Sequence, residues 1–454
     1  MPRLFGTDGV RGVANADLSP ELAFRLGRAG AFCLSRGARR PRVVVGRDTR
    51  ASGELLEAAV VAGLCSVGAD AARVGVITTP GVAYLVRRTK SDAGVVISAS
   101  HNPAEYNGIK FFSAQGYKLP DDLEDQVERL ALDGAEDLPS PTGAGVGRVL
   151  ERAADVEEYL RFLVGSAACR LDGLRVVVDC ANGAASTIAP RVLEELGARV
   201  TPINCRPDGH NINLECGSTC PAALQRAVRE LGADVGLAHD GDADRLIAVD
   251  EKGQVVDGDG IMVVCGLHLH SRGQLGGGTV VTTIMSNLGL DRALAGAGLK
   301  VLRTQVGDRY VLEAMLARGL TFGGEQSGHI ILLDRATTGD GILTALVLLE
   351  AMQESGQPLS KLAARMERLP QQLVNVPVVR GARLDGNARV DAARRGAEAR
   401  GLLVNVRTSG TESAVVRVLV QGQDAAEVAE AAEELAAVIR EELGGERPAA
   451  ANQE

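Results

Sequence analysis

The sequence contains no tryptophan, and only 3% of its 454 residues are aromatic. It has no run near the ~20 consecutive apolar residues that would span a bilayer. The first residues, MPRLFGTDGVRG, lack the apolar centre of a secretion signal. We therefore expect a cytoplasmic protein without a membrane partner. The net charge of −9 argues against a broad nucleic-acid interface, so no nucleic-acid partner is expected.

Cysteine is present at eight positions, and without a secretion signal we expect these thiols to be reduced. Those in small or apolar surroundings are expected to be packing residues: Cys33, Cys65, Cys169, Cys180 and Cys265. One group with metal-binding side chains comprises Cys205, His210, Cys216 and Cys220. Its spacing lacks the paired C-x-x-C of a zinc ribbon, which disfavours a structural zinc site without excluding it.

Apolar strand-like runs alternate with helix-like patterns along most of the chain. The run 42–47 precedes a helical pattern over 51–68, the run 175–180 precedes another over 190–197, and 277–285 opens a third unit. This alternation is typical of β-α-β units with mainly parallel sheets. Because 454 residues exceed one ordinary core, we expect three successive α/β units of roughly 100 to 150 residues each.

The C-terminal part has a different pattern. VNVPVVR, LLVNVRTSGTESAVVRVLVQG and a long Ala/Glu helix over 424–443 predict a small α+β domain with antiparallel strands. The predicted linkers are 134–150, 250–258 and 366–372, and the last of these is a predicted hinge. The final residues, GGERPAAANQE, are expected to be disordered.

A first motif, Ser98-Ala-Ser100-His101-Asn102-Pro103, begins within the apolar run 93–100, which has the length of a strand. A serine delivered to a loop by a strand can serve as a nucleophile if a base or a metal assists its deprotonation. The alternative is a serine that only caps the next segment. Spacing alone does not choose between Ser98 and Ser100.

A second motif places Asp240, Asp242 and Asp244 on one tight loop. Alternate carboxylates on such a loop converge on a hard cation, although a solvated acidic turn is the alternative. Glu251 falls at the twelfth position of an EF-hand pattern. Arg245 occupies the sixth position, where that loop needs glycine, and the flanks are strand-like, so an EF-hand is excluded.

A third motif is Gly323-Gly324-Glu325-Gln326-Ser327-Gly328-His329. Its glycines allow a close backbone approach to a ligand, and its carboxylate and hydroxyl suit sugar hydroxyl groups. A plain glycine-rich turn is the alternative.

A fourth motif is Arg407-Thr408-Ser409-Gly410-Thr411-Glu412, with Arg417 further along. An arginine with hydroxyls and consecutive backbone N–H groups forms an anion nest for phosphate. The Gly-Lys-Ser/Thr ending of a P-loop is absent, so nucleotide binding is not implied, and a hairpin loop without a ligand is the alternative. Together the four motifs supply a nucleophile, a cation site, a sugar-binding loop and a phosphate nest, which points to phosphoryl transfer on a phosphosugar.

The chain resembles the α-D-phosphohexomutase superfamily from Phe5 to about Val420, with all four motifs in order. Within it, the chain is most similar to the bacterial glucosamine-phosphate enzymes. The strings that carry the resemblance are FGTDGVRG (5–12), VVGRDTRASG (44–53), SASHNPAEYNGIKFF (98–112), VGDRYV (306–311), GEQSGH (324–329) and TTGDGI (337–342). Mannose- and glucose-phosphate relatives tend to carry methionine where Gln326 stands. Thr408 and Ser413 depart from the family, which usually has prolines there.

The resemblance implies interconversion of glucosamine 6-phosphate and glucosamine 1-phosphate, a step towards UDP-N-acetylglucosamine and cell-wall precursors. It implies a phosphorylated Ser100, Mg²⁺ as cofactor and glucosamine 1,6-bisphosphate as intermediate or activator. Phosphosugars are the implied partners. The resemblance leaves the oligomeric state open, with a homodimer as one possibility because relatives are often dimers.

The resemblance also implies roles for particular residues. The implied reaction centre comprises Ser100, Lys110 (general acid/base), Arg11 (charge stabiliser), His101 (orientation of the serine) and His329 (substrate contact or proton shuttle). The metal ligands are Ser100, Asp240, Asp242 and Asp244. The substrate-binding residues are Arg245, Gly307, Asp308, Arg309, Glu325 and Ser327. The phosphate-binding residues are Arg407, Ser409, Gly410, Thr411 and Arg417.

The predicted fold class is α/β, with three similar mixed α/β domains and a C-terminal α+β domain around a central cleft. The predicted segments are 1–150 with the phosphoserine, 151–256 with the metal site, 257–368 with sugar recognition, 369–446 with phosphate binding, and the tail 447–454.

Three alternatives stay open. One is a phosphomannomutase/phosphoglucomutase with the same mechanism. Another is a phosphosugar phosphatase, in which water intercepts the phosphoserine. A catalytically inactive phosphosugar sensor is a third, disfavoured by the intact Ser100, aspartates and Lys110.

Overall fold

The computed structural model describes residues 4–6, 8–34, 40–134, 138–379, 382, 384, 386–408 and 415–444. The chain forms two compact units. The larger comprises Arg3–Thr283 and Val301–Arg365, and the smaller comprises Met1–Pro2, Ile284–Lys300 and Met366–Glu454. The motif serines, the three motif aspartates and the glycine-rich loop all lie in the larger unit, and the arginine motif lies in the smaller one.

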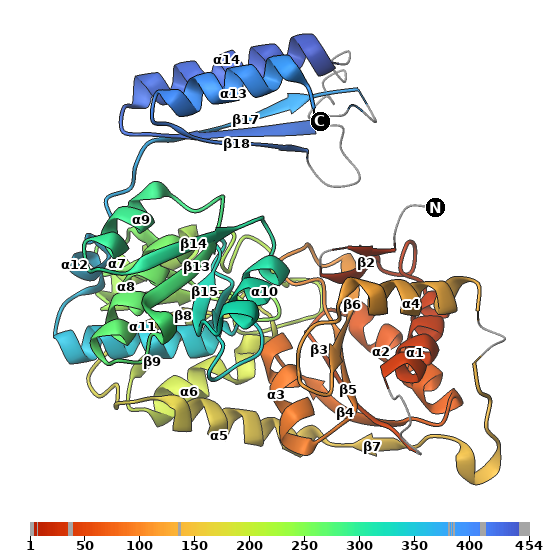
Figure 1. The fold of residues 1–454 in the computed structure, drawn as a ribbon. Helices are drawn as coiled ribbons and strands as arrows, with labels where there is room; N and C mark the ends of the chain where they lie inside the picture. The colour runs from red at the N-terminus through yellow and green to blue at the C-terminus, as the bar shows by residue number, and fades with distance from the viewer. Residues whose placement is uncertain are drawn as a thin grey trace. The chain divides into compact units, whose positions relative to one another are not determined.

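The first sheet of the larger unit has seven strands in the order β1-β2-β6-β5-β3-β4-β7 (Figure 1). β3 runs parallel to β4 and β5, whereas β6 pairs antiparallel with β5 and β2. The valines of β3 are buried, as expected for a β-branched central strand. The elements are β1 (Phe5–Gly6), β2 (Gly9–Val13), α1 (Pro20–Leu34), β3 (Arg42–Arg47), α2 (Ser52–Ser66), β4 (Asp70–Val76), α3 (Thr79–Thr89), β5 (Ala93–Ile97), β6 (Tyr106–Ser113), α4 (Asp121–Leu132) and β7 (Val149–Glu151).

The second sheet has five strands in the order β12-β11-β10-β8-β9. β8 is parallel to β9 and β10, and β11 then pairs antiparallel with β10. The elements are α5 (Val156–Ser166), β8 (Arg175–Asp179), α6 (Ala189–Glu195), β9 (Arg199–Ile203), α7 (Ala222–Leu231), β10 (Val235–Ala238), β11 (Ile247–Asp250) and β12 (Val255–Val256). The loop between β10 and β11 carries the three aspartates.

The third sheet has four strands in the order β14-β13-β15-β16. Two apolar helices, α8 and α11, are buried along most of their lengths. The elements in this part of the chain are α8 (Gly258–Ser271), β13 (Thr279–Thr283), α9 (Leu288–Ala295), β14 (Lys300–Thr304), α10 (Asp308–Arg318), β15 (Phe322–Gly324), β16 (Ile330–Leu332), α11 (Gly341–Ser355) and α12 (Leu359–Ala363). Short 3₁₀ turns span Gly143–Gly145, Ala153–Asp155, Ala184–Thr187 and Gly276–Gly278.

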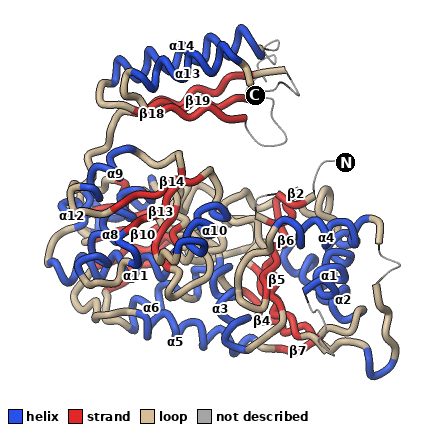
Figure 2. The backbone as a smooth tube through the Cα atoms, viewed as in Figure 1, coloured by secondary structure: helices blue, strands red, loops and turns tan. Residues whose placement is uncertain are grey.

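The smaller unit contains an antiparallel sheet in the order β17-β19-β18, with α13 and α14 along one side of it (Figures 1 and 2). Its elements are β17 (Gln371–Pro377), α13 (Ala388–Ala399), β18 (Leu403–Thr408), β19 (Val415–Gln421) and α14 (Ala425–Leu443). Alternate residues of β19 and one face of α14 form a single core: Val416, Val418, Val420, Val428, Ala431, Ala432, Leu435, Ala436 and Ile439.

The predicted fold class is confirmed in its three mixed α/β sheets and its antiparallel C-terminal sheet. The expected parallel pairing holds in one part of the first two sheets, β5-β3-β4-β7 and β10-β8-β9. The opposite edge of each of these sheets, and β16 in the third sheet, pairs antiparallel. The run 93–100 is not one strand: β5 ends at Ile97, and a turn follows. The predicted disordered tail, 447–454, lies outside the described residues.

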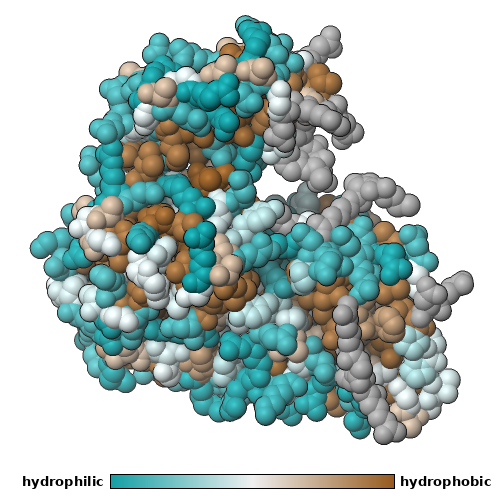
Figure 3. Space-filling view, viewed as in Figure 1, coloured by the Kyte–Doolittle hydropathy of each residue, from teal (hydrophilic) through white to brown (hydrophobic). Residues whose placement is uncertain are grey.

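The visible surface is mostly hydrophilic, with scattered apolar patches (Figure 3). Large apolar side chains that are exposed include Phe32, Leu214 and Leu316, which lie far apart in the sequence. Across the described ranges, no helix is both long enough and apolar enough to cross a membrane.

Candidate active site

Ser100 lies in the turn after β5, and its backbone has φ +52°, a left-handed conformation that is uncommon for serine. Hydrogen bonds hold this conformation. The Ser100 carbonyl accepts from Nη2 of Arg50 at 3.0 Å and from Nδ2 of Asn213 at 2.8 Å. The backbone N–H of Ser100 donates to Oγ of Ser98 at 2.9 Å. The surrounding contacts therefore fix the direction of the Ser100 side chain.

Ser98 is part of a buried support beneath this turn. Its hydroxyl donates to Oδ2 of Asp48 at 2.6 Å, and Asp48 also pairs with Nε of Arg50 at 2.9 Å. Ser98, Asp48 and Arg50 are fully buried. A hydroxyl engaged on both sides in this way supports a structural role for Ser98.

The Ser100 hydroxyl points at the aspartate loop. Its Oγ donates to Oδ2 of Asp240 at 2.6 Å and lies 3.3 Å from Nδ1 of His101. Gly241 allows this approach, because a Cβ there would lie 2.6 Å from the Ser100 carbonyl oxygen. The first and second sheets thus bring the serine and the aspartates together from opposite sides.

Asp240, Asp242 and Asp244 are buried, and each offers a ligand oxygen within 4.8 Å of the others. Oδ2 of Asp242 accepts from Thr79 Oγ1 at 2.6 Å and from Lys110 Nζ at 2.8 Å. Oδ1 of Asp242 and Oδ1 of Asp244 are buried without a hydrogen bond. Buried carboxylate oxygens of this kind fit a divalent cation.

The electrostatics of the loop agree with that fit. Burial, followed by repulsion from Asp244 and Asp242, raises the pKa of Asp240 well above its usual range. The loop connects β10 to β11, so it is flanked by strands and not by the helices of an EF-hand.

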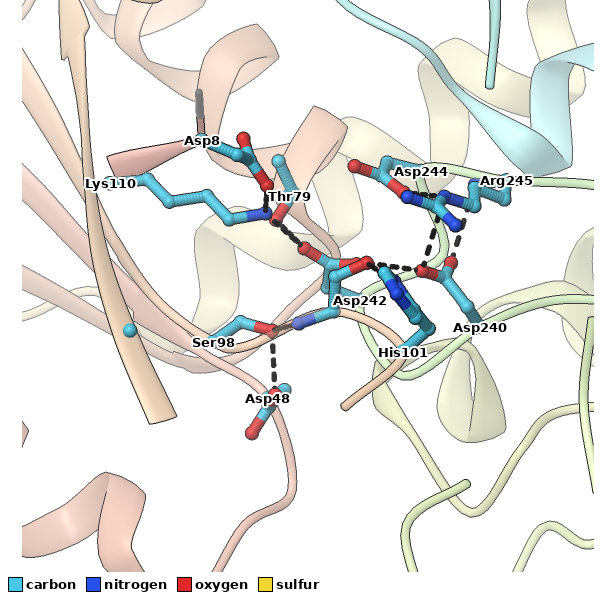
Figure 4. A network of polar contacts seen from close by, with 12 residues as sticks. Asp8, Asp48, Thr79, Ser98, His101, Lys110, Asp240, Asp242, Asp244 and Arg245 are labelled. Carbon is cyan, nitrogen blue, oxygen red and sulfur yellow. Dashed lines mark hydrogen bonds and ion pairs between the residues drawn. The ribbon is translucent and has the colours of Figure 1, made fainter. Parts of the chain in front are cut away.

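Lys110 lies on β6 between two carboxylates (Figure 4). Its Nζ is 2.8 Å from Asp242 Oδ2 and 2.9 Å from Asp8 Oδ2. Burial alone would lower the pKa of Lys110, but Asp242 and Asp8 outweigh burial and raise it. Lys110 is therefore held as a cation beside the serine loop.

Arg11 and His101 complete this side of the site. Arg11 forms an ion pair with Asp8. Burial, with repulsion from Arg245 and Arg11, lowers the pKa of His101 to about 4. The imidazole is therefore neutral at physiological pH, which suits orientation of the serine and does not supply a positive charge.

Arg245 and His329 lie on the other side of the aspartates. Nε of Arg245 is 4.0 Å from Asp240 and 3.8 Å from Asp244. Nε2 of His329 is 3.8 Å from Asp244 and 3.5 Å from Asp308, and both ring nitrogens are buried without a hydrogen bond.

The aspartate loop and the glycine-rich loop touch through their backbones. Arg245 and His329 form an isolated antiparallel bridge, and the N–H of Leu246 donates to the carbonyl of Gly328 at 3.0 Å. Gly328 has φ +91°, and a Cβ there would lie 2.2 Å from the Leu246 carbonyl oxygen. Glycine is therefore required for this contact.

In the predicted sugar-binding loop, Ser327 is exposed and Glu325 is half-buried. Oε1 of Glu325 accepts from the N–H of Gly307 at 3.0 Å, and burial raises the pKa of Glu325. Asp308, the first residue of α10, pairs with Lys118 at 2.5 Å. The loop and the start of α10 are thus joined, as expected if they share one ligand.

Arg309 has a different environment from the one expected. Its guanidinium donates to the Leu119 carbonyl at 3.0 Å, to Glu124 at 3.0 Å and to Asp121. These bonds attach α10 to the start of α4, so the sugar contact of Arg309 stays a prediction.

In the smaller unit, Arg407 lies on β18 directly opposite Arg417 on β19. Nη2 of Arg407 is 3.9 Å from Sδ of Met285. Ser409, Gly410 and Thr411 lie outside the described residues. Phosphate binding by this group stays a prediction.

Several residues of the site were missed by sequence reasoning: Asp8, Asp48, Thr79, Lys118 and Asn213. Asp8 lies in the segment 5–12 and Asp48 in the segment 44–53, and both segments carry the family resemblance. Their place in these segments could have indicated that they belong to the site. Lys118 and Asn213 have no local pattern, because their partners come from distant segments.

A serine held in a left-handed turn, three buried carboxylates that could hold a metal ion and a paired lysine form an arrangement suited to phosphoryl transfer. Four family models match the chain: phosphoglucomutase/phosphomannomutase α/β/α domain I over residues 2–137, domain II over 157–253, domain III over 257–369, and the C-terminal domain over 373–438. The chain therefore belongs to the phosphoglucomutase/phosphomannomutase family of the α-D-phosphohexomutases, which confirms the resemblance stated from the sequence.

Within this family, the chain is similar to proteins of one activity over nearly its whole length. A phosphoglucosamine mutase of Desulforudis audaxviator is 57% identical over 445 residues, covering 97% of this chain and 98% of that protein. A phosphoglucosamine mutase of Symbiobacterium thermophilum is 56% identical over 448 residues, covering 98% and 100%.

Solved structures agree on the fold. A phosphoglucomutase/phosphomannomutase family protein of Burkholderia thailandensis has a TM-score of 0.82 at 24% identity, with 97% of each chain covered. The N-acetylphosphoglucosamine mutase of Aspergillus fumigatus, solved with GlcNAc-6P and magnesium, has a TM-score of 0.68 at 18% identity, covering 96% of this chain and 95% of that one.

Proposed function

We propose that the chain interconverts glucosamine 6-phosphate and glucosamine 1-phosphate, as an intramolecular phosphotransferase of the isomerase class. The observation that carries the chemistry is the Ser100 hydroxyl, held 2.6 Å from Asp240 beside two further buried carboxylates. The identity of 57% to a phosphoglucosamine mutase over nearly the whole chain supports the amino sugar as substrate.

Phospho-Ser100 gives its phosphoryl group to the free hydroxyl of the substrate, so an Oγ–P bond breaks and a new sugar O–P bond forms. Lys110, the candidate general acid/base, would give a proton to the Ser100 oxygen that the phosphoryl group leaves and would take up the proton of the sugar hydroxyl. The product of this half-reaction is glucosamine 1,6-bisphosphate. After it turns around, its other phosphoryl group returns to Ser100 and a proton returns to the released oxygen. Atoms balance over the cycle, and no second substrate is needed.

The chain's own residues prepare this transfer. The bonds from Ser98, Arg50 and Asn213 fix the turn that carries Oγ of Ser100. Lys110 and Arg11 place positive charge where charge develops on the moving group. His101, neutral at physiological pH, orients the serine.

Mg²⁺ would be held by Asp240, Asp242 and Asp244, with an oxygen of phospho-Ser100 completing the site. When bound, the ion neutralises charge on the phosphoryl group. The Oδ1 atoms of Asp242 and Asp244, buried without hydrogen bonds, support this assignment.

For the substrate, Glu325 and Ser327 would hydrogen-bond sugar hydroxyls, with Arg245, Gly307 and Asp308 nearby. The distal phosphate would bind the group formed by Arg407, Ser409, Gly410, Thr411 and Arg417. The four domains would close around one cleft, so that the bisphosphate stays bound while it turns. The enzyme would act in the cytoplasm, supplying UDP-N-acetylglucosamine and cell-wall precursors, and a homodimer stays open.

A coupled assay with glucosamine 6-phosphate, glucose 6-phosphate and mannose 6-phosphate tests the substrate. We expect glucosamine 6-phosphate to have the highest kcat/KM. A higher value for either other sugar would assign the chain to the phosphomannomutase/phosphoglucomutase activity instead. Release of inorganic phosphate without isomerisation would identify a phosphatase.

A further inference from the structure

Five charged side chains form an unbroken series of alternating sign through the larger unit. The series runs Asp308, Lys118, Asp8, Lys110 and Asp242. Successive charged atoms lie 2.5, 2.5, 2.9 and 2.8 Å apart. One end is the start of α10, and the other is the aspartate loop.

Lys118 is one of the two cations in this series, and the proposed function gives it no role. It lies on the loop between β6 and α4, and its side chain is 13% exposed. Its Nζ donates to Oδ1 of Asp8 and to Oδ2 of Asp308. The lysine thus joins a residue of the N-terminal strands to the third sheet's helix α10.

Asp8 connects Lys118 to the reaction centre. Its Oδ1 accepts from Lys118, and its Oδ2 contacts Lys110 and Arg11. Burial would raise the pKa of Asp8, but Lys110, Lys118 and Arg11 together hold it well below its usual range. Asp8 is therefore a fixed anion that receives Lys118 on one oxygen and positions Lys110 with the other.

Asp308 connects the same lysine to the sugar side. The Asp308 oxygen that accepts from Lys118 is also 3.5 Å from Nε2 of His329. Asp308 begins α10 directly after Gly307, whose N–H binds Glu325. The loop that carries Lys118 is anchored nearby, because the Thr337 hydroxyl donates to the Gly116 carbonyl at 2.6 Å.

We propose that Lys118 is a positioning residue of the phosphoryl-transfer site, which acts through Asp8 on Lys110 and keeps Asp308 beside His329. The proposal rests on the proposed function. Without the Lys118 ammonium, Asp8 loses the partner of Oδ1 and rotates, and Lys110 moves with it. Displacement of a catalytic group by about 1 Å can lower a rate by ~10²-fold.

The test compares Lys118→Met with the wild type and with Lys118→Arg, which keeps the charge. Lys361→Met, an exposed lysine on α12, is the matched control. Measurements are kcat and KM for the phosphosugar, the melting temperature, and the rate of Ser100 phosphorylation by glucose 1,6-bisphosphate with Mg²⁺.

We expect Lys118→Met to lower kcat and the phosphorylation rate on the order of 10- to 100-fold, with KM changed less than about threefold. Lys118→Arg should recover at least part of the loss, and Lys361→Met should match the wild type. A Lys118→Met enzyme within twofold of the wild-type kcat, or one whose loss equals its unfolded fraction, would overturn the proposal.

A double-mutant cycle with Asp8→Asn tests the route. If Lys118 acts through Asp8, the double variant is no slower than Asp8→Asn alone. If the two losses multiply, the route through Asp8 is refuted. The phosphorylation readout uses a bisphosphorylated hexose, so it decides on Lys118 even if glucosamine 6-phosphate proves not to be the substrate.

Discussion

The backbone N–H of Ser100 donates to the hydroxyl of Ser98 at 2.9 Å, so the two serines of the motif have different surroundings. Ser98 is engaged by Asp48 below the turn. Ser100 faces Asp240 across the site. Two residues that look equivalent in the sequence thus differ because one supports the turn that presents the other.

Ser100→Ala should abolish labelling by a bisphosphorylated sugar, whereas Ser98→Ala should leave Ser100 as the labelled residue. Loss of the Ser98 hydroxyl removes two hydrogen bonds, and we expect kcat to fall about tenfold or more as the turn loosens. Intact-mass measurement with phosphosite mapping checks both variants. Label retained in Ser100→Ala would move the nucleophile elsewhere, first to Ser98.

Mg²⁺ binding should release a proton and should tighten as pH rises. Burial and repulsion from Asp244 and Asp242 raise the pKa of Asp240, which favours its protonated form in the metal-free protein, and a cation displaces that proton. Calorimetry in two buffers of different ionisation enthalpy, at pH 6 and pH 8, measures both effects. Asp240→Asn should lose the proton release, and Asp242→Ala should lose the Mg²⁺ dependence of activity.

Asp334→Asn is the matched control for the metal prediction, because this aspartate is exposed and outside the site. It should bind Mg²⁺ as the wild type does. Retention of the Mg²⁺ dependence in Asp242→Ala would show that the metal site has been wrongly assigned.

Arg407→Ala should weaken phosphosugar binding more than it slows formation of phospho-Ser100. Removing a guanidinium that binds the substrate phosphate in the ground state raises KM. A charge-assisted hydrogen bond of this kind contributes roughly 1.5–3 kcal/mol, so we expect KM to rise about 10- to 100-fold. Steady-state kinetics and the labelling rate give the comparison. Arg400→Ala removes an arginine of the smaller unit that pairs with Glu434, and it should change neither KM nor the labelling rate. The reverse pattern in Arg407→Ala would exclude a role in phosphate binding.

Asp340→Asn should gain stability relative to the wild type as pH rises from 4.5 to 7. Asp340 caps α11 and accepts from Tyr159 at 2.8 Å, and burial raises its pKa to about 6 from 3.8. Between these values the folded protein binds more protons than the unfolded chain, so this group makes stability fall as pH rises. Asparagine cannot titrate, and the relative gain between pH 4.5 and pH 7 is about 2 kcal/mol.

Urea unfolding of the wild type and of Asp340→Asn at both pH values measures that gain. The comparison cancels the other titrating groups, because they are common to both proteins. An equal stability difference at the two pH values would contradict the raised pKa.

Much of the fold could be predicted because strand and helix patterns are local. The predicted strand 42–47 is β3, and the predicted helix 424–443 differs from α14 by one residue. The error at 93–100 has a physical reason. Apolar character continues past Ile97, but the hydrogen bonds of Ser98 and the left-handed Ser100 end the strand.

The site was predictable where its residues are close in sequence, as in Asp240, Asp242 and Asp244, whose carboxylate oxygens lie within 4.8 Å of one another. It was not predictable where a side chain acts through a distant partner. Lys118 and Asp308 are 190 positions apart, and neither has a pattern that points to the other. Arg309 shows the opposite case, since its motif suggests a ligand contact while its guanidinium holds α4.

The glycine contacts between the aspartate loop and the glycine-rich loop have a mechanical consequence. Gly341, the first residue of α11, makes a second close approach to the aspartate loop, since a Cβ there would lie 2.1 Å from the Arg245 carbonyl oxygen. At these points backbone meets backbone, and no room is left for a side chain in between. The aspartate loop and the glycine-rich loop must therefore move together as one rigid block. Any opening that admits a substrate has to take place at joints on either side of that block.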